Sequence, residues 1–94
     1  MFDIRQESDG QLRLAGRLDA AQAEKADAVL SRVSGSIVCD LEGLEYISSA
    51  GLGVFVKAQL RLQSMGHTIR LINVQPRVRP IFHFALLAKT FGIE

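Results

Sequence analysis

The 94-residue chain has few of the features that mark secreted, nucleic-acid-binding or membrane proteins. Its one cysteine, Cys39, cannot form an internal disulfide and lies in an apolar run, so we expect a buried, reduced thiol that suits the cytoplasm. Eleven basic residues balance ten acidic ones without a basic stripe, which argues against nucleic-acid binding. The longest nearly apolar run, residues 81–88, is far shorter than the ~20 residues that cross a bilayer, so we expect no membrane insertion.

Signatures of catalysis and of cofactor binding are also missing. Neither histidine, His67 or His83, has a partner at metal-ligand spacing. The segment Gly51–Gly53 lacks the length and the lysine of a phosphate-binding loop, and no dinucleotide fingerprint is present. The segment Ser48–Gly51 loosely matches a nucleophile elbow, but the preceding glycine is absent and no histidine is placed to act as a base. We therefore predict a protein that is not an enzyme and that needs no cofactor or metal.

The length and the apolar content fit one folded domain. Hydrophobic residues make up 48% of the chain, so it should fold rather than stay disordered. Ninety-four residues can build one core but not two, which predicts a single domain over residues 1–94. The start, Met1–Arg5, lacks both the basic lead and the apolar stretch of a signal peptide, so we expect a cytoplasmic protein.

The N-terminal third predicts a hairpin followed by a helix. Residues 2–5 and 11–16 alternate apolar and polar side chains, and Asp9-Gly10 between them is a strong hairpin turn. Asp19, with a glutamine three residues later, predicts a helix N-terminus. The helix that follows has an apolar stripe over residues 23–33.

The rest of the chain alternates predicted strands and helices. The apolar run 37–41 indicates a central strand, and we expect Asp40 at its C-terminal end, accepting hydrogen bonds from loop N–H groups. Helical periodicity extends from the two serines to about Met65, and residues 68–72 form the next strand. Pro76 stands where the last helix would begin.

The predicted order is strand, strand, helix, strand, helix, strand, helix, and a last short strand at residues 91–93. Connections of helix length between the later strands indicate right-handed crossovers between parallel strands. We therefore predict an α/β fold: a layered sandwich with a mixed β-sheet, an N-terminal hairpin and helices packed on the sheet.

Two hydroxyl groups, those of Ser48 and Ser49, lie where the central strand gives way to a helix. Backbone N–H groups are unpaired at a helix N-terminus and the dipole there is positive, so an anionic group is favoured. Each serine is therefore either a helix cap or a carrier of phosphate. Asp19 also has two interpretations. It is either a cap of the first helix or a carboxylate near the loop that carries Ser49, the latter if both lie at the same end of parallel strands.

The helix after the serines has two apolar faces. At 100° a residue, the natural core stripe consists of Val54, Phe55, Ala58, Leu62 and Met65. Leu52, Val56 and Leu60 fall on a second face, towards which Ser49 projects. This second face is either covered by the neighbouring helix or left accessible as a partner surface.

Four segments resemble a known family. They are Gly16–Asp19, Cys39–Leu41, Tyr46–Leu52 and Pro76–Val78, in this order and at these spacings. Together they resemble the STAS domain, and most of all the stand-alone bacterial anti-sigma factor antagonists. The resemblance covers essentially the whole chain, and it implies the STAS-like sandwich that the local patterns also predict.

The resemblance implies a phosphorylation switch. The matching target is Ser49, two residues before Gly51, and the alternative is Ser48, which stands where many members have aspartate. The implied partner is a histidine-kinase-like ATPase that is both serine kinase and anti-sigma factor. The unphosphorylated antagonist binds it and releases its target, phosphorylation at Ser49 switches binding off, and a PP2C-type phosphatase restores binding. Asp19 matches the family's acidic position facing the phosphorylation loop.

The surface implied for the partner consists of Ser48, Ser49, Leu52, Val56 and Leu60. Two other functions share the resemblance. One is a STAS subunit that docks on a membrane lipid-transport ABC ATPase, where a threonine commonly replaces the serine. The other is a kinase-linked scaffold outside sigma-factor control.

Overall fold

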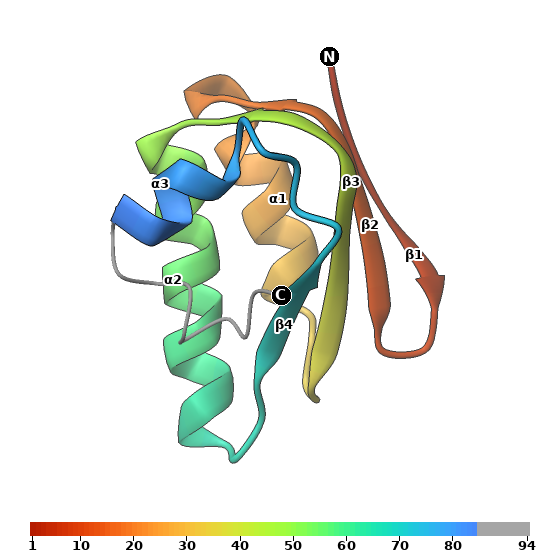
Figure 1. The fold of residues 1–94 in the computed structure, drawn as a ribbon. Coiled ribbons are helices and arrows are strands. Elements are labelled where there is room, and N and C mark those ends of the chain that lie inside the picture. Colours follow the sequence, from red (N-terminus) through yellow and green to blue (C-terminus); the bar gives the residue numbers. More distant parts are fainter. Residues whose placement is uncertain (85–94) are drawn as a thin grey trace.

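The computed structural model describes residues 1–84, and residues 83 and 84 by their backbone alone. A four-stranded sheet has its helices on one face (Figure 1). The elements are β1 (Phe2–Ser8), β2 (Gln11–Leu18), the 3-10 turn η1 (Ala20–Gln22), α1 (Ala23–Leu30), β3 (Ile37–Ile47), α2 (Ser49–Ser64), β4 (Ile69–Ile72) and α3 (Arg79–Phe84). The strand predicted at residues 91–93 lies outside the described part of the chain.

The sheet has the order β1-β2-β3-β4 and is mixed. β1 runs antiparallel to β2, whereas β2, β3 and β4 are parallel to one another. The hairpin turns at Asp9-Gly10, where Gly10 has a φ of 76°. The predicted α/β class, the N-terminal hairpin and the mixed sheet are confirmed. Because β2 and β3 are parallel, their C-terminal ends meet at one edge of the sheet, and Leu18 pairs there with Ile47.

The central strand is longer than the predicted 37–41, since β3 continues to Ile47. Its pairing with β2 shifts register twice, and each shift adds one residue to β3, as a β-bulge does. The buried residues beyond the first shift, Leu44 and Ile47, are therefore three apart, and the period-two pattern of a strand disappears from the sequence. Asp40 is consequently the fourth residue of a long strand, and the expectation that it ends the strand is wrong.

Two helix boundaries also differ from the prediction. α1 ends at Leu30, although Val33 beyond it still packs against the core as the apolar stripe predicts. α3 begins at Arg79 rather than at Pro76, because the carbonyl of Gln75 first closes a turn with the N–H groups of residues 78 and 79. None of the helices in residues 1–84 combines the length and the apolar character needed to span a membrane.

The core lies between the sheet and the helices. Phe55 of α2 and Phe82 of α3 meet edge to face, with ring centroids 6.2 Å apart. Cys39 is fully buried, as predicted, and burial raises the pKa of its thiol from 9.0 to about 12. The buried side chain of Gln59 accepts a hydrogen bond from the N–H of Ile69 at 2.8 Å, which fastens α2 to the start of β4.

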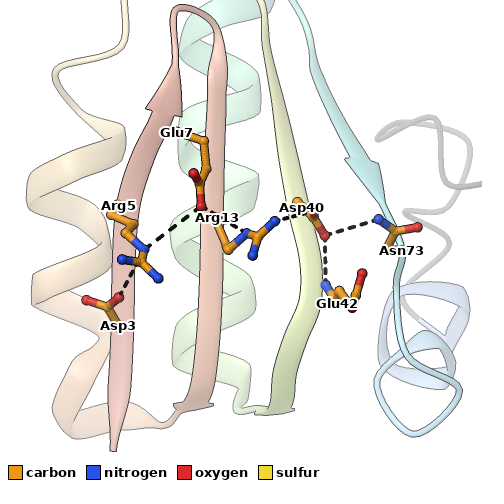
Figure 2. Close-up of polar contacts among 7 residues, drawn as sticks. All are labelled: Asp3, Arg5, Glu7, Arg13, Asp40, Glu42 and Asn73. Atoms are coloured by element: carbon orange, nitrogen blue, oxygen red, sulfur yellow. Dashed lines mark hydrogen bonds and ion pairs between the residues drawn. The ribbon is translucent and has the colours of Figure 1, made fainter.

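The opposite face of the sheet is polar, and Figure 2 shows a chain of contacts that crosses it. The chain consists of Asp3, Arg5, Glu7, Arg13, Asp40, Glu42 and Asn73. Asp40, only 5% exposed, accepts hydrogen bonds from the N–H of Glu42 at 3.0 Å and the amide of Asn73 at 3.2 Å. These bonds satisfy a carboxylate that would be costly to bury alone. The predicted backbone N–H donor to Asp40 is thus present, in mid-strand.

Candidate functional site

The two serines at the start of α2 have different environments. Ser48 precedes the helix in extended backbone, and its Oγ accepts a hydrogen bond from the N–H of Gly51 at 3.1 Å. It therefore has the geometry of an N-cap. Ser49 is the first residue of the helix and is exposed, and its hydroxyl makes no hydrogen bond within residues 1–84. Capping occupies Ser48, and the hydroxyl of Ser49 is left accessible.

We expect Ser48→Ala to lower the free energy of unfolding by about 1 kcal/mol, because it removes the acceptor for a free helix N–H group. Urea unfolding followed by circular dichroism measures the change. Ser49→Ala is the matched control, since Ser49 makes no such bond, and we expect a change within about 0.5 kcal/mol. Equal losses in the two variants would contradict the assignment of the cap to Ser48.

Asp19 lies at the same edge of the sheet as the serines. The N–H of Ser48 donates to the carbonyl of Leu18 at 2.9 Å, so the chain segments that leave β2 and β3 are joined directly. Asp19 follows Leu18, and its Oδ1 accepts a hydrogen bond from the N–H of Gln22 at 3.2 Å. Asp19 thus caps the 3-10 turn η1, while the helix α1 itself begins only at Ala23, and Asp19 lies beside the loop that carries the serines.

Gly51 sets how closely α2 approaches the strand ends. A Cβ at this position would lie 2.7 Å from Cγ and 3.0 Å from the carbonyl oxygen of Leu18, and 3.1 Å from Cγ1 of Ile47. Only a residue without a side chain fits there without a shift of the helix. Gly51 therefore fixes the height of the first turn of α2, and with it the position of Ser49.

The predicted core face of α2 is mostly confirmed. Val54, Phe55, Ala58 and Leu62 are buried. Met65 is 46% exposed, and its assignment to the core is wrong. The helix ends at Ser64, and Met65 has left the helical conformation with a φ of −102°. A stripe derived from helical spacing does not extend past the last helical residue.

The second face of α2 remains partly accessible. Leu52 and Val56 are half-buried, and Leu60 is 63% exposed. α1 lies beside α2 (Figure 1) and is held by an ion pair between Lys57 and Asp27 at 3.2 Å. It therefore does not cover the whole second face. An exposed leucine on the helix that carries Ser49 agrees with the alternative in which this face is left for a partner.

Sequence reasoning missed a contact at the same edge of the sheet. The guanidinium carbon of Arg17 lies 4.4 Å from the ring centroid of Tyr46, within cation–π distance. These two residues pair across β2 and β3, one position before Leu18 and Ile47. The strands predicted from the sequence end at residues 16 and 41, before either residue, so no signal in the sequence indicated this pair. The contact braces the edge from which the serine loop departs.

The hydroxyl of Ser49 is accessible as an acceptor of phosphate, but it has no hydrogen bond to a base among the side chains that the structure describes. His67 lies beyond the other end of α2, where its Nδ1 is 3.4 Å from Oγ of Ser36. In residues 1–84, no three His, Cys, Asp or Glu side chains gather in a way that could hold a metal ion. The arrangement of Ser49 at a helix N-terminus can accommodate a phosphate, because the free N–H groups and the dipole there favour an anion.

Comparisons with known proteins agree with this geometry. A family model described as "Mlab, STAS domain" matches residues 2–92. The anti-sigma-B factor antagonist of Bacillus subtilis (strain 168) is 31% identical, over 98% of this chain and 88% of that protein. The anti-sigma factor antagonist SpoIIAA in its unphosphorylated form has a TM-score of 0.80 at 22% identity, over 100% of this chain and 88% of that one. The Bacillus cell fate determinant SpoIIAA in the phosphorylated form gives a TM-score of 0.73 at 21% identity, over 100% and 91%.

Proposed function

This chain belongs to the STAS domain family, and on that premise we propose that it is a cytoplasmic anti-sigma factor antagonist, switched by phosphorylation at Ser49. In this proposal one STAS domain spans residues 1–94. The unphosphorylated protein binds an anti-sigma factor that is also a serine kinase of the histidine-kinase-like ATPase type. Binding releases the factor that the kinase holds. A PP2C-type phosphatase removes the phosphate from Ser49 and so restores the form that binds. The protein itself is a substrate and a binding module rather than an enzyme.

The observation that supports the proposal is the difference in hydrogen bonding and exposure between the two serines. Ser48 holds the N-cap, so its hydroxyl is engaged with Gly51, whereas the hydroxyl of Ser49 is exposed and without a hydrogen bond within residues 1–84. A kinase can reach Ser49 without unwinding α2. The relative SpoIIAA is described in both an unphosphorylated and a phosphorylated form, and both have the fold of this chain.

The physical effect of the phosphate is expected at the surface. A phosphoserine carries about −1.5 to −2 charges near neutral pH. The N-terminus of α2 favours that charge, so the fold should survive, while the carboxylate of Asp19 at the same edge would repel it. A partner packed over Ser49, Leu52, Val56 and Leu60 would meet a bulky dianion. Modification therefore acts through the shared surface, without refolding.

The proposal is tested by phosphorylation in vitro. The probes are the purified histidine-kinase-like ATPases encoded in the same genome, each incubated with Mg·ATP and this protein, and the products are mapped by peptide mass spectrometry. We expect one phosphate on Ser49 from one of these kinases, which then defines the cognate kinase. Ser49→Ala should accept none, and Ser48→Ala should still be phosphorylated.

Two outcomes would contradict this assignment. Stoichiometric phosphate on Ser49→Ala would move the site, in the first instance to Ser48. No phosphate from any kinase of this class would favour a STAS subunit docked on a membrane lipid-transport ABC ATPase, in which Ser49 is an ordinary helix residue.

A further inference from the structure

A shallow groove of about 230 Å³ lies between α1 and α2, next to the serine loop. Its floor is apolar and made of small residues, among them Ala23 of α1 and Ala50 and Gly53 of α2. Its edge is charged and includes Glu24, Asp27 and Lys57. The groove is thus shallow and open, with small apolar residues and charged residues in its lining.

Gly53 is not explained by the packing of the described residues. It lies inside α2 with ordinary helical backbone, and a Cβ built on it would meet nothing within 4 Å. Gly51, two residues earlier, is buried and has no room for a Cβ. Because a glycine inside a helix is less stable than an alanine, the chain loses helix stability at Gly53 without a packing reason. The missing side chain leaves free space at the floor of the groove.

The groove and the phosphorylatable hydroxyl share one face of the helix. Ser49 and Gly53 are four residues apart on α2, so they are neighbours along the same side. Val56 follows three residues after Gly53, and this stripe leads on to the exposed Leu60. A group seated over Gly53 would therefore belong to the same contact surface as Ser49.

The charge at the rim selects the kind of group that fits. Asp27 forms an ion pair with Lys57, in which Nζ of Lys57 lies 3.2 Å from Oδ2 of Asp27. Glu24 is exposed and forms no ion pair within residues 1–84. One negative charge is therefore left uncompensated beside an apolar floor. A lysine or arginine side chain matches this pattern, because its methylene stem covers apolar surface and its charged end reaches the carboxylate.

We propose, on the basis of the proposed function, that the kinase partner inserts one lysine or arginine side chain into this groove. The stem of that side chain lies over Gly53, and its cationic end pairs with Glu24. Gly53 is then a residue that determines partner recognition: a larger side chain there excludes the stem. The assignment adds α1 to a surface that the sequence had placed on α2 alone.

The experiment measures binding to the cognate kinase, identified by phosphorylation of Ser49, with ADP bound so that no phosphate is transferred. Gly53→Ala should raise the melting temperature, since alanine favours the helix, and yet bind about threefold more weakly. Gly53→Leu should bind at least about tenfold more weakly, and Glu24→Gln about threefold more weakly with a reduced dependence on salt. Ala28→Leu is the control, because Ala28 is exposed on α1 and does not line the groove.

Each outcome decides the proposal. Gly53→Leu with wild-type affinity would overturn the groove as a contact, and unchanged binding of Glu24→Gln would overturn the basic side chain. Equal losses in Ala28→Leu would show a general effect on α1 and overturn the proposal as well. If the wild-type protein binds no kinase, the proposed function fails first. If phosphorylation at Ser49 abolishes binding while Gly53→Leu is silent, only the groove is wrong.

Discussion

Replacing Gly16 with alanine is expected to lower the free energy of unfolding by at least about 3 kcal/mol. Gly16 has a φ of 88°, which an alanine adopts only with strain. An added Cβ would lie 2.0 Å from the carbonyl oxygen of Met1, and that atom accepts a hydrogen bond from the N–H of Arg17 at 2.8 Å. The clash involves backbone rather than a flexible side chain. The β1–β2 pairing must separate, or the hydrogen bond must break.

The measurement is urea unfolding of Gly16→Ala and of Gly35→Ala as the matched control. Gly35 has no unusual φ, and a Cβ there would meet nothing within 4 Å. We expect the control to change stability by no more than about 0.5 kcal/mol. A Gly16→Ala protein as stable as the control would mean that Met1 does not lie against Gly16 at the end of the hairpin.

Gly16 also affects the position of the serine loop. Pairing between β2 and β3 shifts register just after Gly16, so that Arg17 faces Tyr46 and Leu18 faces Ile47. Those pairs bring Asp19 to the edge from which the serine loop departs. A Gly16→Ala protein that folds with altered geometry at this edge of the sheet would therefore also displace Ser49. If a partly folded Gly16→Ala protein is not phosphorylated, the cause is structural.

Turns, caps and helix ends could be predicted from the sequence, because each is determined by a few neighbouring residues. The Asp9-Gly10 turn, the cap at Asp19 and the end of α2 before Gly66 each depend on neighbouring residues, and each is present. The class and the mixed sheet follow from the lengths of the connections between strands. The prediction failed at β3, because its bulges give Leu44 and Ile47 a spacing that does not read as a strand.

The candidate site divides in the same way. The sequence places two hydroxyl groups at a helix start, but it does not show which one caps the helix, since either serine could accept the N–H of a residue three positions later. The backbone settles that point by placing Ser48 in extended conformation and Ser49 in the helix. The groove over Gly53 could not be predicted, because it depends on how α1 lies against α2. In the sequence, Gly51 and Gly53 look equivalent, yet only one of them is packed.

The protein phosphorylated at Ser49 is expected to bind the cognate kinase at least about 100-fold more weakly than the unmodified protein, since a loss of ~3 kcal/mol at one contact is sufficient. Ser49 is exposed at the start of α2, beside the half-buried Leu52 and one turn before Gly53. A partner that packs on these residues must leave the dianion partly desolvated, and the carboxylate of Asp19 at the same edge adds repulsion. The N-terminal N–H groups of α2 offset part of this cost within the free protein, where water also reaches the phosphate. The penalty therefore falls on the complex.

Substitutions at Ser49 separate the effect of charge on binding from an effect on folding. Ser49→Glu adds one charge and less bulk than phosphate, so we expect weaker binding in the same direction but a smaller effect. Ser49→Ala should bind like the unmodified protein and stay bound in the presence of ATP, because it cannot be phosphorylated.

Ser34→Glu is the control. Ser34 is an exposed serine just before β3, at the other end of that strand from Ser49, and its substitution should leave binding unchanged. Isothermal titration calorimetry with the ADP-bound kinase measures the unmodified protein, the phosphorylated protein and the three variants, and circular dichroism should give all five the same spectrum. If Ser49→Glu and the phosphorylated protein bind as tightly as Ser49→Ala, the start of α2 lies outside the contact and Ser49 does not control it. If Ser34→Glu weakens binding as much as Ser49→Glu, the effect is one of net charge and not of the site.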